Sequence, residues 1–345
     1  MGPSESLTDL LAIATTSKSG DADCLAARMD ALLKLGNLLE QHKESLSATQ
    51  TLVGLLAAVR TDGNLLWVTR AVSIVDQLAP VSAVSTLIDV ALADGIAVLD
   101  ALPAERVNAR NDCTHLRCVA IRALGKIGGK FGGKAGDSPA VIPLMSLLND
   151  RGLNYRVRMA AAESLGRLGD AHATAALMDI LQNDEEPSIY LRESTAKALG
   201  MLGDLRAVDA LIEVMNTKKG LRNKLTFLKE RAIQALGQLV SGKKADEKVV
   251  NNLLLSLKDS ASSIRLAAVE ALGDLDDPQW IPHLATCLND SDDMVSLAAI
   301  ASIYNVGGDI ALRALLGLDT LPQFVREEIV TYLDDSNADD EELLL

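Results

Sequence analysis

Three residues in the segment CTHLRC could bind a metal ion or supply a nucleophile: Cys113, His115 and Cys118. This spacing gives at most three ligands, whereas structural zinc sites use four. Cys287 is far away in the sequence, and no third group is placed to orient a Cys–His nucleophilic pair. The sequence therefore predicts no metal site, no catalytic residue and no cofactor.

A glycine- and lysine-rich segment, GKIGGKFGGKAG, could bind phosphate through backbone N–H groups. Lysines recur every four residues at Lys126, Lys130 and Lys134. The stretch from Gly128 to Lys134 fits the pattern GxxxxGK, but Ala135 stands where Ser or Thr would hold magnesium. The preceding element also has a helical pattern rather than that of a strand. These departures argue against nucleotide binding, and two interpretations stay open: a solvated loop, or a basic loop that contacts an acidic partner.

A second basic stretch lies in what the pattern indicates is a lengthened turn between two helices. It contains Lys218, Lys219, Arg222 and Lys224. Charge runs of this kind are usually solvated. Together with the first loop, they predict basic loops along the edges of the fold.

Composition limits the classes of partner. The chain has 345 residues, with 33 Lys and Arg against 47 Asp and Glu, which gives a net charge of -14. Phosphate backbones are bound through an excess of cations, so this balance argues against nucleic acid as a partner. Four cysteines are too few for a disulfide scaffold. We find no signal peptide and no long uncharged apolar run, and we expect a cytoplasmic protein that does not bind membranes.

One sequence pattern recurs along the chain. Segments such as VRMAAAESLGRLGD (157–170) and LRESTAKALGMLGD (191–204) share a leucine before a glycine. This leucine, or its equivalent, serves as a marker for each copy, and the copies are 30 to 49 residues apart. The markers are Leu35, Val75, Leu124, Leu165, Leu199, Leu236, Leu272, Ile303 and Leu333. Such a period is typical of helical solenoid repeats.

Each copy is expected to hold two helices. Val157, Ala161 and Leu165 recur at the spacing of one helical face, and the small alanines allow helices to approach closely. Gly169 and Gly203 suit the left-handed conformation that ends a helix. Asp170 and Asp204 can then cap the next helix.

These motifs resemble a known repeat. Asp259, followed by Ile264-Arg265 and then by Ala267-Ala268 and Ala271-Leu272-Gly273-Asp274, resembles a HEAT repeat. The subtype is similar to the short HEAT-like repeats of phycobilisome bilin lyases and their bacterial relatives. The resemblance is specific over about 112–308 and departs elsewhere, for example at Val75-Asp76. Inside the matched region, Ser296 and Lys229 replace the repeated arginine, so an Asp–Arg ladder is not expected at those two positions.

We therefore predict an all-α fold, a right-handed α-solenoid of about nine HEAT-like helix pairs with one continuous core. Residues 1–111 are expected to form divergent N-terminal repeats that act as a cap region, 112–308 the well-formed repeats and 309–333 a C-terminal capping repeat. Residues 334–345 hold six acidic residues and no base. Like-charge repulsion predicts an acidic disordered tail there.

The resemblance implies that the second helix of each pair lines a concave face. On these helices a row opposite the core combines charged residues with small ones, including Cys118 and the glycines after the markers. It is neither uniformly basic nor aromatic, and both a binding surface and a solvated helix face fit it. The candidate partner-binding residues are Arg122, Met159, Glu163, Glu193, Lys197, Glu230, Gln234 and Glu270.

The functional prediction is a noncatalytic protein-binding scaffold or adaptor that presents a concave helical surface with basic edge loops. The alternative, which the resemblance implies, is a bilin lyase-like or chaperone-type protein-modifying factor acting on a protein-bound tetrapyrrole. Deoxyhypusine hydroxylases resemble this architecture too, but they need His-Glu pairs for iron. None of the four histidines here is followed by Glu, so that activity is not expected.

Overall fold

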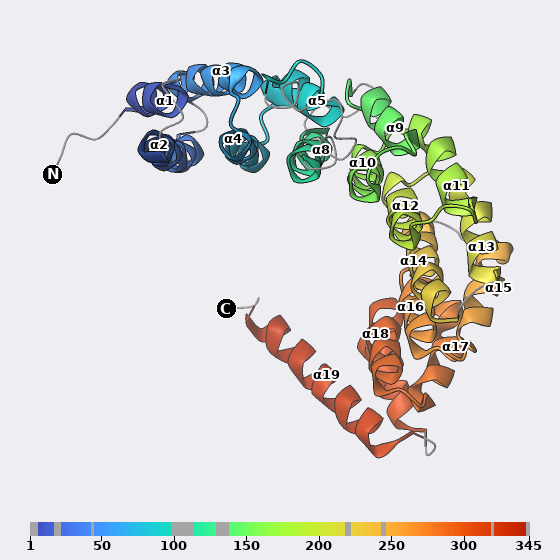
Figure 1. The fold of residues 1–345 in the computed structure, drawn as a ribbon. Helices are drawn as coiled ribbons and strands as arrows, with labels where there is room; N and C mark the ends of the chain where they lie inside the picture. Colours follow the sequence, from blue (N-terminus) through green and yellow to red (C-terminus); the bar gives the residue numbers. More distant parts are fainter. Residues whose placement is uncertain are drawn as a thin grey trace. The chain divides into compact units, whose positions relative to one another are not determined.

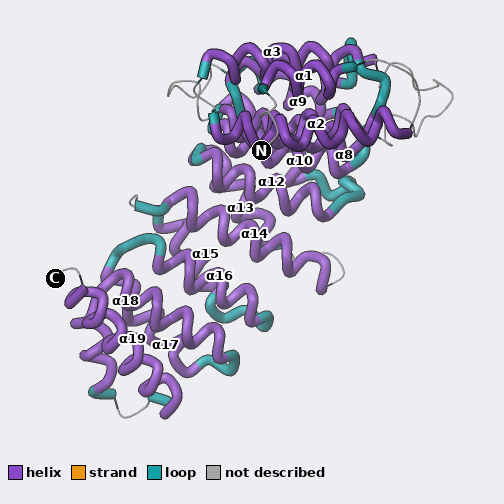
Figure 2. Tube along the Cα trace, turned by 90° about the vertical axis from the view of Figure 1, so that its left-hand side faces the viewer, coloured by secondary structure: helices purple, strands orange, loops and turns teal. Residues whose placement is uncertain are grey.

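The computed structural model describes residues 6–16, 22–42, 45–97, 113–128, 138–217, 222–242, 246–318 and 321–342. For 22, 46, 222–225 and 335–342 it describes the backbone alone. Throughout these ranges, all regular secondary structure is helical, as Figure 2 shows. The all-α prediction is confirmed.

The helices alternate between a first and a second helix of each pair. The first helices are α1 (Leu7–Thr15), α3 (Leu46–Thr61), α5 (Val84–Leu92), α9 (Val141–Asn149), α11 (Thr174–Gln182), α13 (Val208–Asn216), α15 (Glu247–Ser256) and α17 (Ile281–Thr286). Their partners are α2 (Ala22–Gln41), α4 (Leu65–Leu78), α8 (Thr114–Gly128), α10 (Tyr155–Leu168), α12 (Ile189–Leu202), α14 (Arg222–Val240), α16 (Ser262–Gly273) and α18 (Asp293–Leu316). Short 3₁₀ turns adjoin some first helices: η1 (Val81–Ala83), η2 (Ala171–Ala173), η3 (Leu205–Ala207), η4 (Pro278–Trp280) and η5 (Cys287–Asn289).

The last helix pair begins inside α18. Inside α18, Gly308 has φ 61° and ψ -163°, so the helix is broken there into two. The part after Gly308 pairs with α19 (Gln323–Glu342), which gives the ninth pair among the helices that the structure describes. By length and composition alone α18 could cross a membrane. Its break and its buried Ala299, Ile303 and Leu312 instead fit two helices packed in a solenoid core.

The chain divides within α11 into two compact units, Met1–Ala176 and Leu177–Leu345. In each unit the first helices form one layer and the second helices form the other (Figure 1). Each unit is a stretch of α-solenoid, as predicted. The division differs from the boundaries at 111 and 308 that the motifs suggested, and those boundaries stay predictions.

The predicted turn chemistry is confirmed at two joints. Gly169 and Gly203 end α10 and α12 with φ 68° and 78°. Asp170 and Asp204 then accept hydrogen bonds from the backbone N–H groups of His172 in η2 and Arg206 in η3. In the turn before α16, Asp259 accepts a hydrogen bond from Ala261 N–H.

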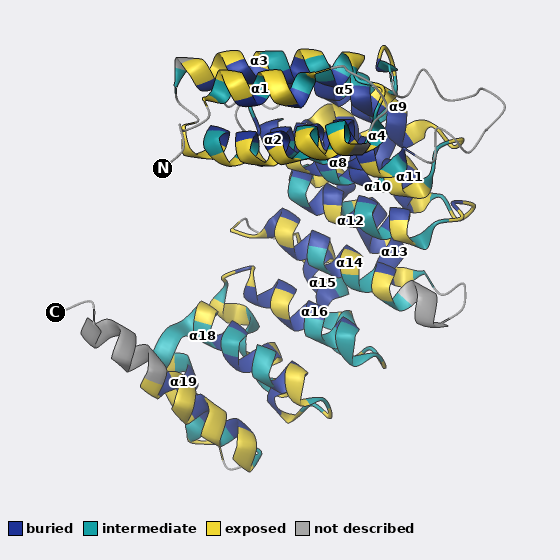
Figure 3. Ribbon diagram, turned by 60° about the vertical axis from the view of Figure 1, so that its left-hand side comes forward, coloured by how far each residue is buried: buried dark blue, intermediate teal, exposed yellow. Residues whose placement is uncertain are grey.

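The core lies between the two layers of each unit (Figure 3). All nine marker residues are buried, with at most 4% of their surface exposed. Alanine, leucine, valine and isoleucine supply nearly all of the core, which agrees with a chain containing only 3% aromatic residues.

The glycines after the markers are contact points between second helices. A Cβ on Gly237 of α14 would lie 2.9 Å from Ala271 Cα of α16, and one on Gly125 of α8 would lie 2.9 Å from Ser164 Cα of α10. Gly200 faces Ala235 in the same way, at 2.8 Å. The prediction that these glycines lie in the exposed row is wrong. They are buried because adjacent second helices pack through them.

In three copies, the recurring arginine of the second helix folds back onto the first helix of its own pair. Nε of Arg158 donates to Leu148 O at 2.9 Å, and Nε of Arg192 donates to Leu181 O at 2.9 Å. Nε of Arg117 donates to Ala91 O at 2.8 Å. These carbonyls belong to the last turn of the first helix, where no intrahelical partner exists. Where Ser296 replaces the arginine, its hydroxyl reaches Cys287 O at 3.3 Å and fills the same role.

The acidic C-terminal segment continues a helix. Because α19 runs to Glu342, the structure corrects the expectation of disorder over 334–342. Val325, Ile329 and Leu333 are buried, so packing supplies the nucleus of this helix. Extending a formed helix through helix formers such as Ala338 and Glu341 then fixes one residue for each hydrogen bond gained.

Candidate functional site

The exposed side of the second helices carries a row of large apolar side chains in or near the first helical turns. Each row member stands nine residues before its marker. Nine steps of about 100° place it on the side of the helix opposite the buried marker. This first-turn row consists of Leu66 in the first unit and Tyr190, Phe227, Met294 and Phe324 in the second. Their exposed fractions are 62%, 60%, 61%, 61% and 36%.

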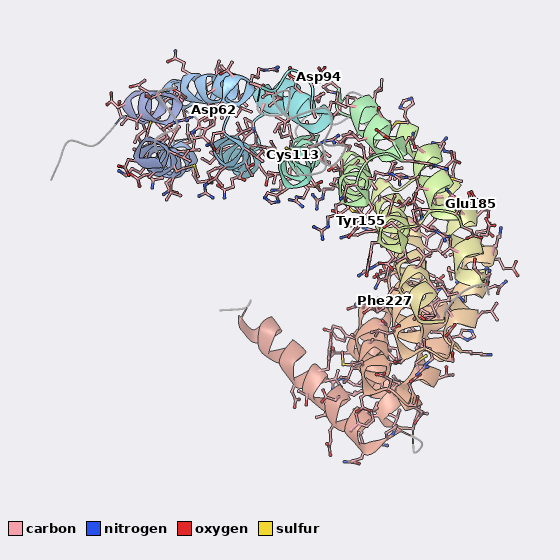
Figure 4. All side chains as sticks on the ribbon, in the orientation of Figure 1. Asp62, Asp94, Cys113, Tyr155, Glu185 and Phe227 are labelled. Atoms are coloured by element: carbon pink, nitrogen blue, oxygen red, sulfur yellow. The ribbon has the colours of Figure 1, made fainter. Side chains whose placement is uncertain are left out.

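Aromatic residues are rare in this chain, yet several of them are exposed here. The sequence holds two Trp, four Tyr and three Phe. Tyr190, Phe227 and Phe324 belong to the row, and Tyr155 is also exposed, in the first turn of α10 with the guanidinium of Arg156 6.0 Å from its ring centroid. Figure 4 shows Phe227 on the second-helix side of its unit and Glu185 on the first-helix side. Exposed aromatic side chains are enriched in protein interfaces.

The predicted partner-binding residues also lie on the second helices. In the first unit, Arg122 of α8 and Met159 and Glu163 of α10 are all half-buried. Adjacent second helices pack together, so these three side chains share one face. In the second unit, Glu193 and Lys197 lie on α12, Glu230 and Gln234 on α14, and Glu270 on α16. Lys197 and Glu270 are exposed and the other three are half-buried.

Burial changes the acidity of several of these groups. Desolvation raises the pKa of Glu193, and the nearby guanidinium of Arg231 opposes that shift. Desolvation also raises the pKa of Glu270, and the like charges of Asp274 and Glu230 add to it. The pKa of Asp274 is raised by burial as well. Of these three carboxyl groups, that of Glu193 is half-buried, whereas those of Glu270 and Asp274 are exposed.

Cys118 does not belong to the exposed row. It is buried, its Sγ lies 3.5 Å from Arg156 O on α10, and burial raises the pKa of its thiol. Like the glycines, it occupies the contact between two second helices. Cys113 is also buried, whereas His115 is exposed. Within the described ranges, no three His, Cys, Asp or Glu side chains are grouped to hold a metal ion.

Four of the lysines predicted to lie in basic loops are outside the described residues: Lys130, Lys134, Lys218 and Lys219. Lys126 is in α8, where its Nζ pairs with Asp76 of α4 at 2.8 Å. Arg222 and Lys224 are in α14, so placing them in a loop was wrong. Arg and Lys are good helix formers, and the buried face of α14 at Leu228 and Ala232 lets the helix extend to them.

Sequence reasoning missed the first-turn row. Part of the signal was present, because aligning the copies on their markers places Leu66, Tyr190, Phe227, Met294 and Phe324 in one column. In the other four copies this column holds Ala26, His115, Arg156 and Ser263. The expected exposed row was instead drawn through positions closer to the marker, and it therefore included residues that the next helix covers.

A comparison with protein families decides which repeat this is. The model described as HEAT repeats matches residues 108–189, 154–226, 219–304 and 250–334. The chain belongs to the HEAT-repeat family. By sequence, no curated protein matches this HEAT-repeat chain.

Solved structures with similar folds include proteins of different function. Kap95p, in a structure with RanGDP, aligns with a TM-score of 0.55 at 13% identity, over 94% of this chain and 46% of its own. The complex of CpcE and CpcF, a phycocyanin lyase from Nostoc sp. PCC7120, has a TM-score of 0.42 at 24% identity, over 68% of this chain and 98% of that one. Human deoxyhypusine hydroxylase has a TM-score of 0.32 at 18% identity, over 87% and 95%. At these identities the likeness shows the fold alone.

Proposed function

We propose that this HEAT-repeat protein is a noncatalytic binding scaffold that holds a partner protein along the exposed side of its second helices. The observation that carries this proposal is the first-turn row. Water contact with a large apolar side chain is unfavourable, by about 25 cal/mol for each Å². Covering Tyr190, Phe227 and Met294 with a partner would remove that contact.

The chemistry of this face favours a protein over other ligand classes. Its rings alternate with carboxylates and a few cations, whereas a nucleic acid would need an excess of positive charge. Protein interfaces have a core of aromatic and apolar side chains with a polar rim. The first-turn row and the charged residues beside it have this composition.

Site-specific photo-cross-linking tests the proposal. A photoreactive phenylalanine analogue replaces Phe227 on the second-helix face or, as a control, Leu255 on α15, which is 65% exposed. The chain is expressed in its native cells, and cross-linked proteins are identified and then purified. The proposal expects a partner that cross-links at position 227 and not at 255.

The purified partner must then bind the purified chain, and Phe227→Ala together with Tyr190→Ala must weaken that binding about tenfold or more. A partner that cross-links equally at both positions, or whose affinity these changes leave intact, overturns the assignment of this face.

A further inference from the structure

Positive charge is concentrated on two adjacent second helices of the first unit, α8 and α10. Each helix carries three Lys or Arg residues, and the two together carry a single acidic residue, Glu163, in a chain whose net charge is -14. Arg117 and Arg158 are buried and donate to carbonyls of the first helices. The other four cations reach the surface: Arg122, Lys126, Arg156 and Arg167.

The four surface cations lie on the side of their helices opposite the buried markers. Arg122 stands two residues before its marker, and Lys126 and Arg167 stand two residues after theirs. Arg156 stands nine residues before its marker, in the column of the first-turn row. At about 100° for each residue, all four positions lie within about 20° of the point opposite the marker. The exposed side of the second helices, which is apolar in the first turns of other copies, is therefore basic here.

Close contacts hold α8 and α10 side by side (Figure 1). A Cβ on Gly125 would lie 2.9 Å from Ser164 Cα, and nearer the first turns Cys118 Sγ lies 3.5 Å from Arg156 O. Arg122 follows Cys118 by one helical turn, so it lies on the side of α8 that meets α10. Burial raises the pKa of the Cys118 thiol, and the charges of Arg122 and Arg156 both oppose that rise. The fold thus places these two arginines beside the same helix contact.

Three of the four surface cations have no carboxylate partner in the part of the chain that the structure describes. Arg122, Arg156 and Arg167 form no ion pair there, whereas Lys126 pairs with Asp76 of α4. We call these three residues the arginine triplet. A guanidinium binds a carboxylate through two parallel hydrogen bonds, so the triplet offers three unused sites of this kind.

The triplet is spread along the two helices. Arg156 and Arg167 are eleven residues apart on α10, which is about 16 Å at 1.5 Å for each residue. The contacts of Cys118 and Gly125 with α10 place Arg122 between these two levels. A single phosphate or carboxylate is too small for all three. An extended peptide advances about 3.3 Å for each residue, so three carboxylates on alternate residues lie on one side and span about 13 Å.

We propose that α8 and α10 bind an extended acidic segment of the partner protein through the arginine triplet. The inference rests on the proposed function and specifies one part of its partner. Carboxylates of the segment pair with the guanidinium groups, and the exposed ring of Tyr155 beside Arg156 covers an apolar side chain of the same segment. A basic segment is rejected, because it places like charges against the triplet. A nucleic acid is disfavoured, because most of its length would face a chain with a net charge of -14.

Defined peptides and the full chain provide the test. Two fluorescent peptides of equal length are compared: one with glutamates at alternate positions separated by serines, and one with glutamine in place of each glutamate. Binding is measured by fluorescence anisotropy at about 0.15 M salt, where the repulsion between the acidic chain and an acidic peptide is screened beyond about 8 Å. The glutamate peptide is expected to bind at least about tenfold more tightly than the glutamine peptide, through three ion pairs.

Two triple variants localise the binding. The triplet variant combines Arg122→Gln, Arg156→Gln and Arg167→Gln. The control variant removes the same charge from exposed positions of the second unit through Arg206→Gln, Lys248→Gln and Arg313→Gln. The triplet variant should lose about tenfold in affinity for the glutamate peptide, and the control variant less than about twofold. Because the triplet holds no ion pair in the described structure, urea unfolding of its variant should match that of the wild type.

Equal losses in the two triple variants, or equal binding of the two peptides, overturn the inference. Inorganic pyrophosphate that displaces the glutamate peptide at equal concentration overturns it in favour of a small anion. A single-stranded oligonucleotide that binds more tightly than the peptide and depends on the triplet overturns it in favour of a nucleic acid. A partner cross-linked at position 227 that binds the triplet variant with unchanged affinity overturns this inference and leaves the proposed function standing. Absence of any cross-linked partner at position 227 overturns the proposed function instead.

Discussion

The guanidinium of Arg265 on α16 donates two parallel hydrogen bonds to the carboxylate of Asp290. Asp290 follows the first helix of the next pair. Nε lies 2.8 Å from Oδ2, and Nη2 lies 2.6 Å from Oδ1. Both side chains are only 12% and 11% exposed. The same guanidinium donates from Nη1 to Asp259 O at 2.9 Å. One arginine therefore ties the turn before its own helix to the adjacent pair.

This ion pair predicts a pH-dependent stability. The hydrogen bonds from Arg265 hold the pKa of Asp290 below its ordinary value of 3.8. A carboxylate whose pKa is lower in the folded state stabilises the fold above its unfolded pKa and loses that contribution as the pH falls through the folded value. The melting temperature of the wild type should therefore fall more steeply below about pH 4 than that of Asp290→Asn. Parallel pH curves for the two proteins would contradict the prediction.

Gly237→Ala should destabilise the second unit. The new Cβ would lie 2.7 Å from Ala271 Cβ and 2.9 Å from Ala271 Cα, so the two helices must move apart. Overpacking of this kind costs about 1–3 kcal/mol, partly offset by the better helix propensity of alanine, about 1 kcal/mol. Urea unfolding measures the change. Gly63→Ala is the control, because a Cβ there meets nothing within 4 Å and its stability should not fall.

Arg158→Met should lower the free energy of unfolding by about 1.5–3 kcal/mol, the contribution of a hydrogen bond from a charged group. Arg158 is 3% exposed and donates to Leu148 O at the end of α9. Methionine keeps most of the side-chain length but leaves that carbonyl without its donor. Arg167→Met, on the exposed side of the same helix, should change stability by less than about 0.5 kcal/mol. Similar effects of the two changes would show that the carbonyl contact is not what matters.

Phe227→Ala and Leu228→Ala separate the binding surface from the core. Phe227 is 61% exposed and its neighbour Leu228 is 1% exposed. Truncating the leucine should cost about 2–5 kcal/mol, whereas the phenylalanine should change stability by less than about 0.5 kcal/mol. Chemical denaturation of both variants checks this. A large loss for Phe227→Ala would mean that its ring supports the fold.

Glu270→Gln should stabilise the protein at neutral pH. Its pKa is raised in the folded state by burial and by Asp274 and Glu230, so the ionised form opposes folding at neutral pH and protonation favours it. Solvent screening limits the gain to a few tenths of a kcal/mol. The difference between wild type and variant should shrink as the pH falls toward the pKa of the folded carboxylate. A variant less stable than the wild type at pH 7 would show that Glu270 has a favourable contact instead.

The sequence by itself determined the repeat and its local chemistry. Every marker residue is buried, so the nine markers from Leu35 to Leu333 could be placed in the core from their spacing alone. The helix ends could be predicted from Gly169 with Asp170 and from Gly203 with Asp204. The left-handed cap and the acidic N-cap act over only a few residues. Each of these signals involves residues only a few positions apart, so the sequence alone is enough to recognise it.

What only the tertiary structure decided is which side of each second helix meets its neighbour. Gly237 and Cys118 looked like surface residues on one helix, and they are buried because another helix lies across them. That covering leaves the first-turn row on the exposed side of the second helices. The angle at which adjacent helices pack depends on contacts between residues more than 30 positions apart, and no single copy of the repeat contains that information.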